Sequence, residues 1–291
     1  ILLNFSTVCA DDVDNEVDFE DTIEVTASNV SELPKTNSRR YIVYDRISKS
    51  MIIGKNEDVK SAMASTTKIM TTIVILEKAD LNEKVTVSAK AGGTGGSRLG
   101  LKRGDKASVR DLLYGLMLRS GNDAAVALAE HVGGSVKGFA ELMNEKAIEL
   151  GLTNTHFVTP HGLDDANHYT TALELAKLTD YAMDNETFAK IVGTKSTTIY
   201  INNQSRQINN TNELLGVLNG VVGVKTGFTN NAGRCLVTET KRNNMDIITI
   251  VLGADTKKDR TKDSVNLIEY TFSKYKMYNL EEQIIEEFNK W

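Results

Sequence analysis

Cysteine is scarce in this sequence: Cys9 and Cys235 are the only two among 291 residues. Two cysteines cannot build the multi-disulfide framework of a small secreted domain, and no CxxC pattern for a structural metal occurs. If a leader peptide is removed after Ala10, Cys9 leaves with it. We therefore expect no disulfide, and we expect Cys235 to be a small buried apolar residue.

Basic residues are absent from residues 1–34, which hold nine of the 39 acidic residues of the chain. The remainder, 35–291, therefore carries 34 basic and 30 acidic residues, a balance of +4. An acidic segment with few apolar residues cannot bury enough surface to offset the entropy cost of ordering it. We expect residues 11–37 to be an acidic, disordered tail before a mildly basic domain.

Long apolar runs are absent as well, and the run at residues 1–10 is too short to span a bilayer. It ends in Val8-Cys9-Ala10, which resembles the end of a secretory signal, with small residues before the cleavage point. The alternative is a few apolar residues of a mature N-terminus. We favour a signal-peptide remnant, and hence an extracytoplasmic protein that is secreted or held in the cell envelope.

Two kinds of ligand-binding motif are missing. The glycine-rich stretch at 92–105 lacks the GxxxxGK[ST] pattern of a phosphate-binding loop. His156, His161 and His168 lie close in the sequence but lack the HExxH spacing of a zinc site. We expect no metal and no cofactor, and we expect no nucleic-acid partner.

The apolar patterns predict a sheet assembled from both ends of the chain. Residues 41–46 and 50–55 are rich in β-branched and aromatic residues and predict a hairpin. Late strands are predicted at 195–201, 206–210, 222–227, 233–240 and 245–253. Helices are predicted at 65–79, 108–118, 124–132, 135–151, 171–183, 258–276 and 280–290.

This order of strands, helices and strands excludes the alternating βαβ pattern of a doubly wound parallel sheet. We expect a mixed α/β (α+β) fold, in which an antiparallel five-stranded sheet joins the early hairpin to three late strands. Helices flank the sheet, and a helical subdomain is inserted. One domain is predicted over 38–278, followed by an amphipathic helix at 279–291.

Three short motifs follow one another at wide spacing. Ser65-Thr66-Thr67-Lys68 is followed after 55 residues by Ser120-Gly121-Asn122, and Lys225-Thr226-Gly227 comes a further 105 residues on. Each motif alone is common in proteins. A second SxxK pattern at Ser273–Lys276 has no partner motifs after it and indicates a helix surface. The ordered series is typical of penicillin-recognising serine enzymes.

The first motif predicts a nucleophile and its base. Residues i and i+3 share a helix face, so Lys68 can lie beside the Ser65 hydroxyl. A serine hydroxyl reacts only when a base removes its proton. Lowering a lysine pKa from about 10.4 to about 7.5 costs roughly 4 kcal/mol in charged-form stability. Burial and a second cation, Lys225, can supply that shift.

The other two motifs complete the predicted site. Ser120 bridges the two lysines and relays a proton to the leaving amine. Asn122 orients Lys68 and binds a substrate amide. Thr226 holds a substrate carboxylate, and Gly227 permits close approach of the substrate backbone.

The backbone N–H groups of Ser65 and Phe228 are the predicted oxyanion hole, because two converging donors stabilise the negative charge of a tetrahedral intermediate.

The chain resembles the serine-type D-Ala-D-Ala carboxypeptidases, also called low-molecular-mass penicillin-binding proteins, including sporulation-associated secreted members. The resemblance spans 38–276 and lies in ASTTKIMT, SRLGLKRGD, LLYGLMLRSGNDAA, TPHGLDDANHYTTALELA and KTGFTNNAGRCLV. It implies a β-lactamase/transpeptidase-like fold and a structural role for His161. It also implies that Arg260 contacts the terminal carboxylate of the substrate.

By this resemblance, the expected reaction is removal of the terminal D-Ala from peptidoglycan stem peptides through an acyl-serine at Ser65. β-Lactams are expected to acylate the same serine. Family members commonly add a small β-rich domain and an amphipathic membrane anchor. The predicted helix at 279–291 has an acidic polar face, which does not favour peripheral membrane association.

Two alternatives stay open. A class A β-lactamase needs a glutamate in an ExxLN-like element to activate the deacylating water. None occurs in 123–224, where Glu174 begins ELAKL and Glu213 begins ELLGV. The second alternative is a catalytically silent cell-wall-binding module, which need not keep all the motif residues.

Overall fold

The computed structural model describes residues 33–275. The predicted signal-peptide remnant, the tail up to residue 32 and the helix at 279–291 lie outside these residues. Within them, no helix is both long enough and apolar enough to cross a membrane.

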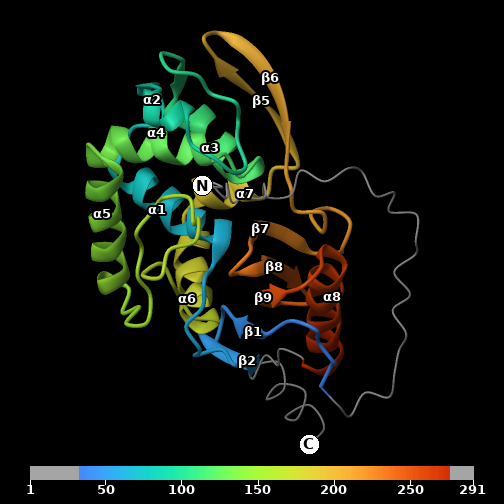
Figure 1. Ribbon diagram of the computed structural model, residues 1–291. Helices are drawn as coiled ribbons and strands as arrows, with labels where there is room; N and C mark the ends of the chain where they lie inside the picture. The colour runs from blue at the N-terminus through green and yellow to red at the C-terminus, as the bar shows by residue number, and fades with distance from the viewer. Residues whose placement is uncertain (1–32, 276–291) are drawn as a thin grey trace, which may run out of the picture.

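A five-stranded antiparallel sheet forms one side of the domain (Figure 1). Its strand order is β2 (Ser50–Lys55), β1 (Arg40–Asp45), β9 (Met245–Ala254), β8 (Gly233–Arg242) and β7 (Val221–Thr229). Every neighbouring pair is antiparallel. The prediction that an early hairpin joins three late strands is confirmed.

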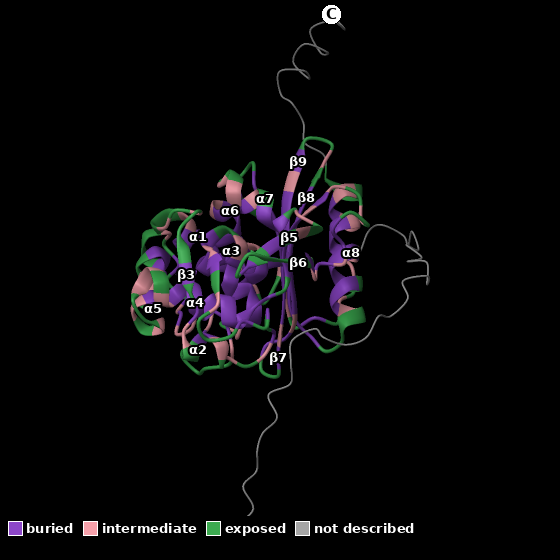
Figure 2. Ribbon diagram, turned by 90° about the horizontal axis from the view of Figure 1, so that it is seen from above, coloured by how far each residue is buried: buried purple, intermediate pink, exposed green. Residues whose placement is uncertain are grey.

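Both faces of this sheet are covered by helices. Helix α8 (Lys257–Lys274) contacts β8 and β9 on one face, and α6 (Ala172–Met183) contacts β1 and β9 from the other (Figure 2). Strand β9 is therefore buried along almost its whole length, which accounts for its run IITIVLGA, apolar except for the buried Thr249. A half-exposed strand would alternate between apolar and polar residues.

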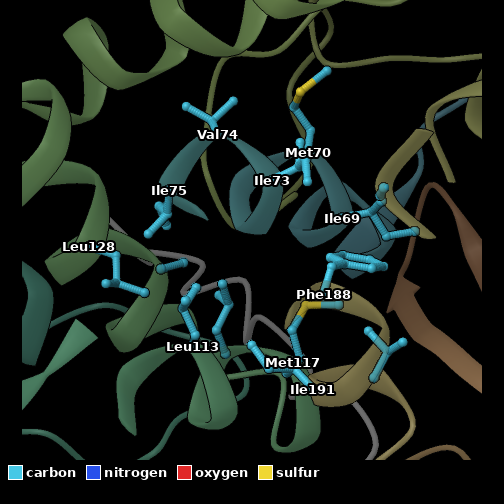
Figure 3. Close-up of a cluster of buried hydrophobic side chains, with 14 of the residues drawn as sticks. Ile69, Met70, Ile73, Val74, Ile75, Leu113, Met117, Leu128, Phe188 and Ile191 are labelled. Carbon is cyan, nitrogen blue, oxygen red and sulfur yellow. The ribbon is translucent and has the colours of Figure 1, made fainter. Parts of the chain in front are cut away.

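The helical subdomain packs around α1 (Lys68–Lys78), which contacts α3, α4, α5, α6 and α7. The surrounding helices are α3 (Val109–Leu118), α4 (Asn122–Gly133), α5 (Val136–Glu149) and α7 (Glu186–Val192). Figure 3 shows the apolar side chains that meet there, among them Ile69, Ile73, Leu113 and Phe188, all 0–1% exposed. Each such side chain contributes about 1.5–3 kcal/mol by burial.

A second sheet of four short strands was not predicted. Its order is β3 (Lys84–Thr86), β4 (Lys106–Ser108), β5 (Ser196–Ile201) and β6 (Gln204–Asn209). The predicted late strands at 195–201 and 206–210 belong to this sheet. Strands β3 and β4 have three residues each, too few for an alternating pattern to show. The short helices α2 (Ala89–Gly92), of four residues, and α7, of seven, were also missed.

The helix predicted from Ser65 begins differently. Residues Ala64–Thr67 form a 3-10 turn, η1, and the α-helix starts only at Lys68. Cys235 is fully buried, as predicted.

Candidate active site

The turn η1 holds Ser65 in a fixed and unusual backbone. Ala64, the residue before it, has φ +49°, a left-handed conformation that disfavours a residue with a Cβ. Hydrogen bonds within the turn oppose this strain: Thr66 Oγ1 donates to the Met63 carbonyl at 2.6 Å and Thr67 Oγ1 to the Ala64 carbonyl at 2.8 Å. Ser65 itself is 4% exposed.

Lys68 lies one turn after Ser65 and is fully buried. Its Nζ is 2.6 Å from Ser65 Oγ, 2.7 Å from Asn122 Oδ1 and 3.0 Å from the His161 carbonyl. The two carbonyl-type oxygens can only accept hydrogen bonds. The Lys68 amine donates to all three oxygens in this arrangement, and the short distance to Ser65 Oγ lets a neutral amine take the hydroxyl proton instead.

The SGN motif lies in the loop between α3 and α4, as predicted. Ser120 has φ +57° and is 4% exposed. Asn122 Nδ2 donates to the Gly95 carbonyl at 2.9 Å, which leaves its Oδ1 turned to Lys68. The backbone N–H of Asn122 also donates to the Ser97 carbonyl at 2.8 Å. The predicted contact between Asn122 and Lys68 is thus present, and the glycine-rich loop fixes its geometry.

The KTG motif lies on β7, directly beside η1. Lys225 is buried, and its Nζ donates to the Thr226 carbonyl at 2.9 Å. A Cβ added at Gly227 would lie 3.0 Å from the Ser65 backbone N and 3.1 Å from Ala64 Cβ. Glycine at 227 thus allows the turn η1 to lie close to β7. From the sequence, we had expected it to allow close approach of the substrate backbone.

The same contact brings the Ser65 N–H against the strand that carries Phe228, the other predicted oxyanion donor. The Phe228 ring is half-buried under the Arg234 guanidinium, whose central carbon lies 3.9 Å from the ring centroid. This cation–π contact fixes the side chain of the residue that directly follows the motif.

Arg260 lies in the first turn of α8 and is fully buried. Its Nη2 donates to Glu213 Oε1 at 2.8 Å, and Lys257 Nζ lies 2.9 Å from Oε2. Burial alone would raise the pKa of Glu213, but Arg260 and Lys257 hold that pKa below its usual range. Two residues earlier, Thr211 Oγ1 lies 2.8 Å from Thr226 Oγ1. The segment 211–213 thus joins Arg260 to the KTG strand.

The loop 158–168 supports the site in ways that sequence reasoning missed. Besides the contact of the His161 carbonyl with Lys68, the Pro160 carbonyl accepts from Thr71 Oγ1 at 2.6 Å. Burial, followed by the charge of Lys68, lowers the pKa of His161 to about 3, so its ring is neutral. At the other end, Asp164 Oδ1 accepts from Thr229 Oγ1 at 2.6 Å and ties the loop to β7. Backbone carbonyls carry no sequence signal, so only a resemblance could have indicated this loop.

Asp123, the residue after the SGN motif, was also missed. Its buried carboxylate accepts from the backbone N–H groups of Leu99, Gly100 and Leu101 at 2.8, 2.8 and 2.9 Å. These bonds anchor the glycine-rich loop, whose carbonyls in turn hold Asn122. Among the described residues, no three His, Cys, Asp or Glu side chains gather as a possible metal site.

Comparisons with known proteins agree with this geometry. The sequence matches the family Peptidase S11, D-alanyl-D-alanine carboxypeptidase, over residues 26–256. It is 37% identical over 245 residues to the D-alanyl-D-alanine carboxypeptidase DacF of Bacillus subtilis, covering 82% of this chain and 63% of that protein. It is 38% identical over 270 residues to DacC of Escherichia coli, covering 84% and 64%. The chain thus spans just under two thirds of the length of these relatives.

Solved structures give the same result for the fold. The crystal structure of the Streptomyces K15 DD-transpeptidase aligns with a TM-score of 0.78 at 34% identity, covering 83% of this chain and 99% of that one. The D-alanyl-D-alanine carboxypeptidase DacD from Francisella tularensis aligns with a TM-score of 0.79 at 30% identity, covering 87% and 75%. The predicted β-lactamase/transpeptidase-like fold is confirmed.

Proposed function

Because this chain belongs to the peptidase S11 family of D-alanyl-D-alanine carboxypeptidases, we propose that it removes the terminal D-Ala from peptidoglycan stem peptides through an acyl-Ser65 intermediate. The observation that carries the proposal is the 2.6 Å contact between Lys68 Nζ and Ser65 Oγ. Asn122 Oδ1 and the His161 carbonyl also accept from Nζ, which holds the lysine amine beside that hydroxyl, where a neutral amine can take its proton.

Acylation proceeds in two proton transfers. Lys68 takes the proton of the Ser65 hydroxyl as Oγ attacks the carbonyl carbon between the two D-Ala residues. The N–H groups of Ser65 and Phe228 donate to the resulting oxyanion. When the intermediate collapses, the C–N bond breaks, and the departing D-Ala amine receives a proton through Ser120, which lies between the lysine side chains in this scheme.

Deacylation uses the same groups. Water gives its proton to the base, attacks the acyl carbon, and releases the shortened stem peptide while Ser65 Oγ recovers its proton. The free carboxylate of the substrate is bound by Thr226. Arg260, predicted to contact this carboxylate, is fully buried and donates to Glu213, so its positive charge acts on the carboxylate without direct contact. A carboxylate at this position matches the requirement of a carboxypeptidase for a free chain end.

Labelled penicillin tests the nucleophile. The protein should become covalently labelled, and Ser65→Ala should abolish the label. The chain offers a matched control in its second SxxK pattern: Ser273 is exposed, near the end of α8, and its Oγ donates to the Tyr270 carbonyl. Ser273→Ala should label like the unchanged protein. Labelling that persists in Ser65→Ala would refute the assignment.

Release of D-Ala from diacetyl-Lys-D-Ala-D-Ala separates the remaining functions. A carboxypeptidase releases D-Ala and turns over penicillin slowly. Rapid penicillin turnover without D-Ala release would indicate a β-lactamase, and neither label nor product would indicate a silent wall-binding module. Glu174 and Glu213 are both engaged elsewhere, Glu174 with the Asn154 N–H at 2.8 Å and Glu213 with Arg260.

We also propose that the protein acts outside the cytoplasm, with peptidoglycan stem peptides as its partner and β-lactams as inhibitors. The support is the nature of the proposed substrate, together with the apolar run at residues 1–10. Fractionation of producing cells tests this proposal, since an exported protein is recovered from the envelope or the medium.

A further inference from the structure

His168 is a buried histidine that the proposed reaction does not use. It is 3% exposed and lies edge-on to Phe157, with ring centroids 5.7 Å apart. It is 103 residues from Ser65 in the sequence, at the end of the loop 158–168. Its two ring nitrogens make different hydrogen bonds, and together these bonds determine where its proton lies.

The Nδ1 atom is an acceptor. The backbone N–H of Val158 points to it at 3.0 Å, and that of Thr159 at 3.4 Å. Because a backbone N–H can only donate, Nδ1 carries no hydrogen, and the neutral ring carries its hydrogen on Nε2. Burial lowers the pKa of His168 to about 4, with smaller contributions from His156 and Lys68 and an opposing one from Asp165.

The Nε2–H group therefore donates to Thr67 Oγ1, which lies 2.8 Å away. The Thr67 hydroxyl in turn gives its own hydrogen to the Ala64 carbonyl at 2.8 Å. A directed chain of hydrogen bonds thus runs from His168 through Thr67 to Ala64. It ends on the residue directly before Ser65, in the strained left-handed backbone at φ +49°.

Such a conformation persists only where its surroundings hold it in place. Gly162, on the same loop as His168, fits directly over this carbonyl: a Cβ at 162 would lie 1.9 Å from the Ala64 oxygen. The loop also holds Lys68 through the His161 carbonyl. One loop therefore fixes both the nucleophile, through Ala64, and the base.

We propose that His168 is a positioning residue, which donates from Nε2 to Thr67 and so holds the Ala64–Thr67 turn with Ser65 Oγ facing Lys68. The proposal rests on the proposed function for its kinetic consequence. A displacement of the nucleophile by about 1 Å can lower an acylation rate by about 100-fold.

Two substitutions separate positioning from general stability. His168→Asn puts an amide oxygen at the place of Nδ1 and keeps the bond from Val158, but it cannot reach Thr67. His168→Gln places its amide N–H near Nε2 and keeps the bond to Thr67, but it loses the one from Val158. Each variant gives up one buried hydrogen bond, so both should lower Tm by a similar amount.

The acylation rate by labelled penicillin should differ between them. We expect His168→Asn to be slower than the unchanged protein by about 10- to 100-fold and His168→Gln by less than about threefold. Thr67→Val should match His168→Asn, and Thr67→Ser, which keeps the hydroxyl, should restore the rate. Equal rates for Asn and Gln at 168, or for Val and Ser at 67, would overturn the proposal.

Hydrogen exchange makes this test independent of activity. His168→Asn should speed backbone amide exchange at residues 64–68, and His168→Gln should not. If the unchanged protein takes no label, the proposed function fails, and the exchange difference alone decides the role of His168. If the protein takes label but exchange and rates are the same in both variants, only the positioning role fails.

Discussion

Gly227 allows the turn that carries the nucleophile, Ser65, to lie directly against strand β7. At Gly227 a Cβ would meet the Ser65 N at 3.0 Å and the Thr66 N at 3.2 Å, tighter than ordinary contacts. Both neighbours are backbone atoms, which cannot move aside as a flexible side chain can. The sequence identifies this glycine through the KTG motif, but the reason for it lies in a turn 160 residues away.

Gly227→Ala should therefore slow acylation by penicillin by about 10- to 100-fold, because the turn must move away from β7. Gly95→Ala is the matched control. Nothing lies within 4 Å of a Cβ at that position, and its carbonyl can still accept from Asn122. The rates are measured by quenching the labelling reaction at a series of times and quantifying the labelled protein on a gel. Equal rates for the two variants would contradict the close contact between η1 and β7.

The buried neutral histidines predict how stability depends on pH. The pKa of His168 falls to about 4 in the folded protein, against about 6.5 in an unfolded chain. The unfolded chain therefore binds the proton first, so stability is fully present above pH 6.5 and is lost as pH falls towards 4. Each such histidine contributes a slope of about 1.4 kcal/mol per pH unit within that window.

His168→Gln should flatten this slope by about that amount, since glutamine does not titrate. Urea unfolding of both proteins at several pH values between 7 and 4.5 measures the difference. If the free energy of unfolding changes with pH in the same way in both proteins, His168 has the same pKa in the folded and unfolded states, and the prediction is wrong.

At the scale of elements, the helices and strands with a clear apolar periodicity could be predicted from the sequence, and those without one could not. Helices α1, α3 and α6 and strand β9 have clear apolar patterns, and the sequence located them. Strands β3 and β4 carry no such pattern: they pair with each other over three residues, and β4 meets β5 at one pair, Ala107 with Ile201. The 3-10 start of α1 depends on the loop 158–168 and on β7, neither of which is local to it.

Asp123 shows how one element holds another. Its carboxylate joins the start of α4 to the glycine-rich loop through three backbone N–H groups. Asp123→Ala leaves these buried donors unpaired and should lower the free energy of unfolding by about 2–4 kcal/mol. It should also slow acylation, because the loop carbonyls of Gly95 and Ser97 no longer hold Asn122.

Asp105→Ala is the control within the same loop. Asp105 also accepts a backbone N–H, from Lys102 at 2.8 Å, and the side-chain N–H of Asn202 at 2.7 Å, but both bonds are exposed, so water can replace the carboxylate. We expect a loss below about 1 kcal/mol. Both free energies of unfolding are measured with urea. Similar losses in the two variants would mean that the burial of Asp123 adds nothing to the stability that its hydrogen bonds provide.

At the scale of the whole molecule, the site lies where the two parts of the domain meet. Ser65 lies in the turn before α1, the central helix of the helical subdomain, and Lys68 begins that helix. Asn122 begins α4, and Lys225 belongs to strand β7 of the sheet. The three motifs indicated that the site lies between the two parts. Motifs that act together but lie 55 and 105 residues apart in the sequence must be brought together by the fold. A second link between the parts is Arg46, whose guanidinium contacts Asp180 on α6 at 2.9 Å and Glu239 on β8 at 2.5 Å.

The start of the domain at residue 38 remains a prediction, and the contacts there define a test. Asp263 Oδ2, on α8, accepts from the Asn37 N–H at 2.9 Å, the Ser38 N–H at 2.7 Å and Ser38 Oγ at 2.5 Å. Ser38 is fully buried, so the chain is fastened to α8 at this point. A protein beginning at residue 33 should therefore keep the urea midpoint and penicillin labelling of the full chain.

Asp263→Ala should instead lower the free energy of unfolding by about 2–4 kcal/mol, because it leaves buried donors unpaired. Asp259→Ala, one turn earlier on the same helix, is the control. Asp259 accepts from Asn37 Nδ2 at 2.7 Å and from Thr256 Oγ1 at 2.6 Å, both in exposed positions where water can replace it, so the loss should be less than about 1 kcal/mol. If removing residues 1–32 destabilises the protein as much as Asp263→Ala does, the domain extends further towards the N-terminus than the sequence predicts.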